Sequence, residues 1–131
     1  MNELIADVIH IQNNENLHIV TFGINETRLS MMSLELDRLH QGSTVRLSIK
    51  PMNIALGKNI SGTFSFINQL SATIKEVRVG MLLCSILVDF QGIELESIIT
   101  KTAYEHLALK PQEHVTLFIK ASDLSIKEVI Q

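Results

Sequence analysis

Apolar and polar residues alternate in short runs along most of the chain. From Val115 to Ile119 an apolar residue stands at every second position, which is typical of a half-buried strand. Lys120 follows, then a small turn of Ala, Ser and Asp, and then a second apolar run. The same order of strand, lysine, turn and strand stands seventy positions earlier, at 45–54. The repeat predicts a duplicated small domain, with a lysine at the matching corner of each copy.

The rest of the pattern predicts five short strands and one short helix in each copy, in the same order. Helix formers precede the fourth strand of each copy, and glycine- and asparagine-rich turns separate the others. The expected strands are 2–11, 17–22, 28–33, 45–49 and 53–56, then 68–74, 81–90, 93–100, 115–119 and a run from 124, with helices at 34–40 and 101–109.

This order is typical of an all-β fold, here two tandem OB-like five-stranded barrels, each with one short helix. The expected domains are residues 1–58 and 59–131. In this alignment the Ser-Ile-Ile-Thr sequence at 97–100 corresponds to Ser-Met-Met-Ser at 30–33. Strand order within each barrel does not follow from the pattern.

Composition changes this picture in one respect. Of the 131 residues, 46% are apolar although only 5% are aromatic. A domain of about 60 residues buries only about 60% of its unfolded surface. So much Ile, Leu and Val in such small units implies apolar surface shared between the copies or between subunits. We therefore expect a homo-oligomer, a dimer or a trimer.

Charge and the reactive side chains exclude several classes of function. The net charge of −3 gives no field for nucleic acid or an anionic membrane, and the absence of Trp argues against a stacking surface for single strands. Cys84 is the sole cysteine, so it forms no intrachain disulfide and is expected in the core of a cytoplasmic protein. The five histidines lack metal-site spacing, and no catalytic triad or carboxylate pair can be argued. We expect neither an enzyme nor a metal centre.

Three short motifs in the second copy carry a resemblance to a known family. They are Ser-x-x-Asn-Gln-Leu at 65–70, Ser-Ile-Ile-Thr at 97–100 and Ile-Lys-Ala-Ser-Asp-Leu at 119–124. The first copy holds looser forms of the last two, at 30–33 and 49–54. In this order the motifs resemble the molbindin (Mop, or TOBE) domain family over the whole chain. The resemblance implies OB-like domains that bind molybdate or tungstate where domains meet.

The resemblance also implies a set of oxyanion-binding residues. In the second copy these are Ser65, Thr100, Lys120, Ala121 and Ser122, and in the first copy they are Ser33 and Lys50. The chain departs from the family pattern at Ile67, where an arginine is usual, at Ala103, where a serine is common, and at Met52, where a hydroxyl residue is expected.

The residue types themselves fit an anion site. A tetrahedral dianion needs several donors, and a lysine, hydroxyl groups and a tight turn of backbone N–H groups supply them. The predicted function is therefore cytoplasmic binding of molybdate or tungstate, for storage, buffering or sensing, without an organic cofactor. The alternative is an interaction or oligomerisation module with a degraded pocket, partnering a separate regulator or transporter ATPase. For the lysines, the competing interpretation is that they are solvated strand-end residues.

Overall fold

The structure is a computed structural model that describes residues 2–35 and 38–131. The described residues form ten strands, one α-helix and two short 3₁₀ turns, so the fold is mainly β. In chain order the elements are β1 Asn2–Asn14, β2 Leu17–Ile24, β3 Thr27–Ser33, β4 Thr44–Ile49, η1 Pro51–Asn53, β5 Ala55–Gly57, β6 Asn68–Val79, β7 Leu83–Phe90, β8 Ile93–Thr100, α1 Lys101–Leu107, β9 His114–Ile119, η2 Ala121–Asp123 and β10 Ser125–Val129.

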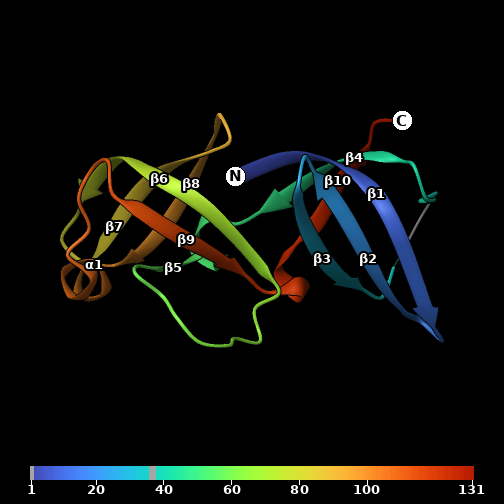
Figure 1. Ribbon diagram of the computed structural model, residues 1–131, viewed down its shortest axis with the longest axis horizontal. Helices are drawn as coiled ribbons and strands as arrows, with labels where there is room; N and C mark the ends of the chain where they lie inside the picture. Colours follow the sequence, from blue (N-terminus) through green and yellow to red (C-terminus); the bar gives the residue numbers. More distant parts are fainter. Residues whose placement is uncertain (1, 36–37) are drawn as a thin grey trace.

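The strands form two five-stranded sheets that exchange their last strands. One sheet has the order β10-β4-β1-β2-β3 and the other β5-β9-β6-β7-β8. The two sheets lie side by side along the long axis of the molecule, and η1 and η2 carry the chain across between them (Figure 1). Sequence order alone therefore does not assign β5 and β10 to a sheet. The expected domain limits, 1–58 and 59–131, stay a prediction.

Strand register shows that the two sheets are built alike. The long strands β1 and β6 each carry a bulge, between Val8 and His10 and between Ile74 and Glu76. A bulge bends a long strand and lets it serve two neighbours. Hairpin pairing places Leu29 opposite Phe22 and Leu95 opposite Val88. Equivalent positions in these strands are therefore sixty-six apart, and the alignment of Ser97–Thr100 with 30–33 is wrong by one residue. Thr100 corresponds to Leu34.

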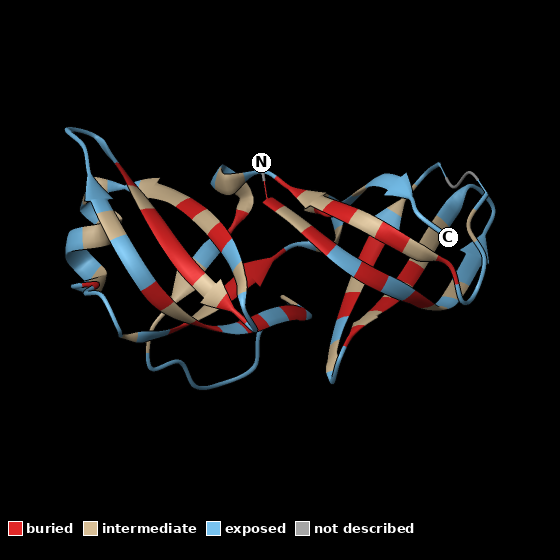
Figure 2. Cartoon of the chain, turned by 90° about the horizontal axis from the view of Figure 1, so that it is seen from above, coloured by how far each residue is buried: buried red, intermediate tan, exposed pale blue. Residues whose placement is uncertain are grey.

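The buried side chains of both sheets join in one hydrophobic cluster. Buried and exposed positions alternate along the strands, as the period-two pattern predicts (Figure 2). Ile54 and Leu124, just after the two 3₁₀ turns, are buried and fasten each crossing to the core. Cys84 is fully buried within it, as expected of a small core residue. Part of the apolar surface predicted to be shared is therefore buried between the two halves of one chain.

Two buried asparagines clasp the sheets to each other. The Asn68 side chain accepts from the Ser30 backbone N–H at 2.6 Å and donates to its carbonyl at 2.8 Å. Asn2 makes the same pair of bonds with the Glu96 backbone, both at 2.8 Å. Each first strand thus grips the third strand of the other half, where an extended backbone offers both groups side by side. These asparagines are therefore structural and bridge the two sheets.

The helix predicted at 34–40 is not seen at the described positions 34, 35 and 38–40; positions 36 and 37 lie outside the described residues. Isolated short helices are marginal, so their ends decide whether they form. In the second half, the Thr100 hydroxyl caps α1 by accepting from the Ala103 N–H at 3.1 Å. In the first half, the Ser33 hydroxyl instead bonds the N–H of Glu35, two residues on, which is a turn geometry. The expectation of one helix per half is wrong for these residues.

Ion pairs hold the exchanged strand and the linker in place. On the first sheet, Glu3 pairs with Lys127 of β10 and with Arg46, and the hydrogen bond from Lys127 is the main reason that the Glu3 pKa lies below its ordinary value. In the linker, Lys58 donates to the carbonyls of Leu107 and Ala108 and pairs with Glu113 at 3.0 Å. This lysine also holds the pKa of Glu113 below its usual range.

Candidate functional site

The two repeated lysines stand at the start of the crossing turns. Lys50 precedes η1 with φ −68° and ψ 137°, and Lys120 precedes η2 with φ −69° and ψ 145°. In both turns the lysine carbonyl accepts a backbone hydrogen bond at 2.9 Å, from Asn53 or from Asp123. Both lysines are exposed. The matched corner predicted from the repeat is therefore present in the structure.

A cavity of about 270 Å³, which we call the polar corner cavity, opens between the two turns. It combines one amine and three hydroxyl groups with an amide and a carboxylate. Ser125 on β10 donates to the Ser48 carbonyl at 3.3 Å, which keeps these two strand ends together. The cavity is lined by Ser48, Lys50, Asn53, Ser122, Asp123 and Ser125.

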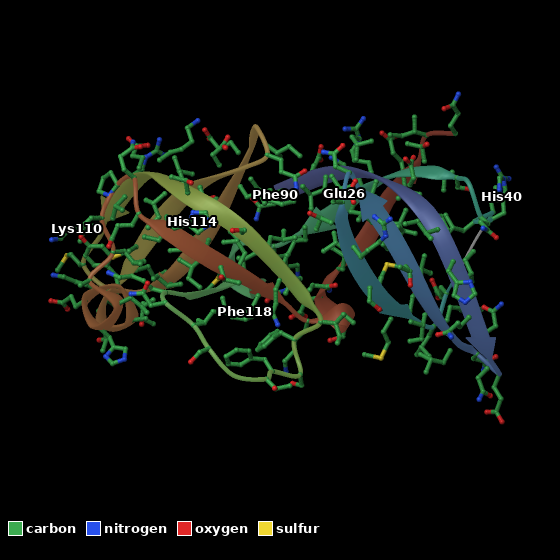
Figure 3. All side chains as sticks on the ribbon, in the orientation of Figure 1. Glu26, His40, Phe90, Lys110, His114 and Phe118 are labelled. Atoms are coloured by element: carbon green, nitrogen blue, oxygen red, sulfur yellow. The ribbon has the colours of Figure 1, made fainter. Side chains whose placement is uncertain are left out.

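A second cavity of about 480 Å³, the apolar corner cavity, is also lined by residues of both turns. Lys120 and Thr100 line it together with mostly apolar side chains. Phe118 on β9 forms part of the wall, and its ring packs 5.5 Å from that of Phe64 and 5.3 Å from that of Phe66, on the loop at 58–67 (Figure 3). The full lining is Met52, Asn53, Ile54, Ala55, Phe66, Leu83, Ile98, Ile99, Thr100, Ala103, Phe118, Lys120 and Asp123.

The two cavities lie at equivalent places in the two halves of the chain, whose sheets are built alike. Every residue of the polar corner cavity has its equivalent, seventy positions away, in the wall of the apolar one. Ser122 is replaced by Met52, Ser125 by Ala55, and Ser48 by Phe118. Each cavity has one lysine, Lys50 or Lys120, and the pair of Asn53 and Asp123 lines both cavities. The two cavities thus share the cation and differ in the groups around it.

These cavities divide the residues predicted from the sequence. Lys50 and Ser122 meet in the polar corner cavity, and Lys120 and Thr100 meet in the apolar one. Lys50 and Ser122 come from different halves of the chain, because each crossing turn contributes to both cavities. The residues predicted for the second copy are thus divided, with Thr100 and Lys120 in one cavity and Ser122 in the other.

Three other predicted residues lie nearby but outside the described linings of both cavities. Ser65 is exposed on the loop between Phe64 and Phe66. The Ser33 hydroxyl donates to the Glu35 carbonyl at 2.7 Å, at the end of a strand that contacts η2. Ala121 is half-buried as the first residue of η2.

Sequence reasoning missed Ser48, Ser125 and Asn53, which line the polar corner cavity. Ser48 stands two residues before the lysine on the outer face of β4, and β10 brings Ser125 beside it. A signal for Ser48 existed, since residues two apart on a strand share a face. Nothing in the sequence indicated that β10 pairs with β4.

The comparisons with known proteins bear on this arrangement. The TOBE domain family matches residues 65–126. A molybdate-binding protein from Sporomusa ovata is 33% identical over 51% of this chain and 100% of its own, with a TM-score of 0.50. The chain belongs to the molbindin, or TOBE, family. The resemblance inferred from the motifs is thereby confirmed at the level of the family.

A longer structural match covers nearly the whole chain. The cytoplasmic molybdate-binding protein ModG, in a form with molybdate bound, matches with a TM-score of 0.89 and 26% identity, over 95% of this chain and 94% of that one. A comparison with curated proteins gave no match.

Metal-ion sites and membrane-spanning helices are two further features considered for the described residues. The described residues hold no group of three or more His, Cys, Asp or Glu side chains arranged for a metal ion. Within the same residues no helix is long and apolar enough to cross a membrane.

Proposed function

We propose that this molbindin-family chain binds molybdate or tungstate as a free oxyanion, and that the polar corner cavity is its main site. The observation that carries the proposal is the meeting of Lys50 with three serine hydroxyls, from Ser48, Ser122 and Ser125, at the crossing of the two halves. A ModG structure of the same fold has molybdate bound.

The chemistry of the cavity supports this assignment. The lysine amine supplies a positive charge and up to three donors, and the Ser48 and Ser122 hydroxyls can turn their hydrogens toward the anion. The Ser125 hydroxyl must give up its 3.3 Å bond to the Ser48 carbonyl to do the same. Hydrogen bonds to an ionised group contribute about 1.5–3 kcal/mol each, roughly twice the contribution of neutral ones. The first N–H groups of a helical turn have no partner inside the turn, so Ser122 also offers its backbone. In η1, Pro51 has no N–H group, whereas its counterpart Ala121 in η2 has one.

Lys120 and Thr100 form a second, weaker candidate site in this proposal. Their cavity keeps the cation, but methionine, alanine and phenylalanine replace the hydroxyl groups. Apolar walls offer the oxygens of a dianion no hydrogen bonds. The roles expected of Ser65, Ser33 and Ala121 stay predictions.

The proposal extends to the architecture and the setting. We take the halves to be two tandem OB-like units of the Mop type, each completed by a strand of the other. The smaller relative supports this division, since its whole length matches about half of this chain. A cytoplasmic storage, buffering or sensing role and a homo-oligomer, dimer or trimer, belong to the same proposal. The neighbours in structure are binding proteins, which supports a function other than catalysis.

Isothermal titration of the full chain with sodium molybdate and with sodium tungstate tests the proposal. Saturable binding of either anion, competed by the other, is the expected result. Sodium chloride at equal ionic strength is the control for general salt effects. Absence of heat and of any thermal shift with both anions would contradict oxyanion binding.

A specific observation favours the alternative, an interaction module for a separate regulator or transporter ATPase. Met81 and Leu82, in the turn between β6 and β7, are 92% and 81% exposed, and Val79 beside them is 52% exposed. An exposed apolar group of this kind often marks a protein contact. Capture of partners from cell extract, with and without molybdate, separates the functions. A partner held equally in both conditions, together with no oxyanion binding, supports the alternative.

A further inference from the structure

The walls of both corner cavities include a group that opposes binding of a dianion. Asp123 is half-buried at the end of η2 and lines both cavities. An ionised carboxylate only accepts hydrogen bonds, and its charge repels an anion. Its counterpart in the first half is Asn53, whose amide can donate. The duplicated positions therefore hold a donor in one turn and an acceptor in the other.

The surrounding charges leave Asp123 free to respond to an anion. Lys50 and Lys120 share its cavities, yet among the described residues neither forms an ion pair with it. The other charged groups on the strands that pack around η2 are engaged elsewhere. Arg28 on β3 donates to the carbonyls of Asn25 and Thr27.

The remaining charges on these strands lie on β4 and β10. They pair with one another and with Glu3 on β1; the groups concerned are Arg46, Lys127 and Glu128. His114, at the far end of β9, bonds the Ser71 hydroxyl.

We propose that the polar corner cavity takes up one proton with each oxyanion, and that this proton lies between the Asp123 carboxylate and an oxygen of the anion. This inference rests on the proposed function. A proton on Asp123 removes the repulsion and turns the group into an O–H donor, so the dianion and the proton favour each other's binding. Molybdate and tungstate draw this proton from water or buffer. An anion that already carries a hydrogen, such as hydrogen phosphate, brings its own.

Proton uptake during titration with sodium molybdate tests the inference. We would titrate the full chain in two buffers of different ionisation enthalpy, from about pH 6.5 to about pH 8.5, so that the difference in heat counts protons. One proton per anion is expected, and molybdate affinity is expected to fall about tenfold per pH unit as pH rises. The variant D123N should bind without proton uptake and with an affinity that does not depend on pH. The matched variant N53A should still take up the proton.

Hydrogen phosphate in the same titrations sharpens the test. At about pH 8.5, where hydrogen phosphate is the main species, the wild-type chain should bind it without net proton uptake, and D123N should disfavour it relative to molybdate. Molybdate binding without proton uptake at any pH would overturn the inference and leave the proposed function intact. Absence of binding by every anion would overturn the proposed function and the inference together. If D123N does not fold, as judged by circular dichroism, the wild-type pH series decides the outcome alone.

Discussion

The two corner cavities lie at equivalent places in the two halves of the chain, but their surroundings differ. Both have a lysine at the start of a 3₁₀ turn with nearly identical backbone angles. One lysine is accompanied by serine hydroxyls, and the other by Met52, Ala55 and Phe118. A repeated cation thus indicates where a site can form, and the residues around the cation determine what the site can bind.

Removal of the hydroxyls of the polar corner cavity should have the largest effect on molybdate affinity. We expect the double variant S48A/S122A to bind molybdate about 100-fold more weakly, because two hydrogen bonds to a charged group contribute about 1.5 kcal/mol each. Titration calorimetry measures the loss. The control is M52A, in the apolar corner cavity, which should leave the affinity nearly unchanged. An unaltered affinity in S48A/S122A would show that these hydroxyls do not contact the anion.

The crossing that brings the cavities together depends on the asparagine clasps. N68A leaves the Ser30 N–H and carbonyl without their partner in a buried place, and we expect it to lower the free energy of unfolding by about 2 kcal/mol. N2A should cost less, since Asn2 is 6% exposed and Asn68 is 1% exposed. Urea denaturation measures both. Equal, negligible losses would show that the clasps do not stabilise the contact between the sheets.

Hydroxyl groups placed in the apolar corner cavity should make the two sites more alike. The double variant M52S/A55S gives the Lys120 side two of the serines that its counterpart has. The second site, which is weak in the wild-type chain, should then fill during the titration, about tenfold more weakly than the first, because Phe118 still occupies the place of Ser48. The measurement is the stoichiometry in calorimetry. A stoichiometry unchanged from wild type would mean that the surrounding hydroxyls do not decide the difference.

Acid should loosen the exchanged strand that completes the polar corner cavity. The pKa of Glu3 is held below its ordinary value of 4.5 by Lys127 and Arg46. A carboxylate with a lowered pKa stabilises the fold above 4.5, and this contribution is lost as pH falls through its folded-state value. The melting temperature should fall as the solution is acidified, and slightly less in E3Q. E26Q, in an exposed turn, is the control. An identical fall in melting temperature in E3Q and wild type would show that the Glu3 carboxylate does not stabilise the exchanged strand.

Much of the fold was predictable because period-two alternation is strong in β1, β4, β6 and β9. The exchange of β5 and β10 was not, since a strand of three to five residues can pair with either sheet. The one-residue error at Thr100 arose because the two serines, Ser30 and Ser97, were matched by identity. Burial instead matches Ser97 with Met31, since both side chains are buried. At the described positions 34, 35 and 38–40 no helix is seen, and the Ser33 hydroxyl bonds Glu35 in a turn, a local arrangement that competes with helix formation.

For the candidate site, the sequence indicated both lysines with Ser122 and Thr100, but not Ser48, Asn53 and Ser125. Lys120 stood out because the motif around it resembles the family pattern more closely than the motif around Lys50 does. The structure instead gathers hydroxyls around Lys50, and it does so by joining residues from turns seventy positions apart. Such a site depends on the crossing of the chain, which a linear pattern does not reveal.

The central claim is that Lys50, and not Lys120, holds the main oxyanion. Molybdate affinity of K50M and K120M, measured side by side by titration calorimetry on folded protein, tests it most directly. We predict that K50M loses at least about tenfold in affinity and K120M less than about threefold, since a bond to a charged group contributes about 1.5–3 kcal/mol. A loss in K120M equal to or greater than that in K50M would contradict the account.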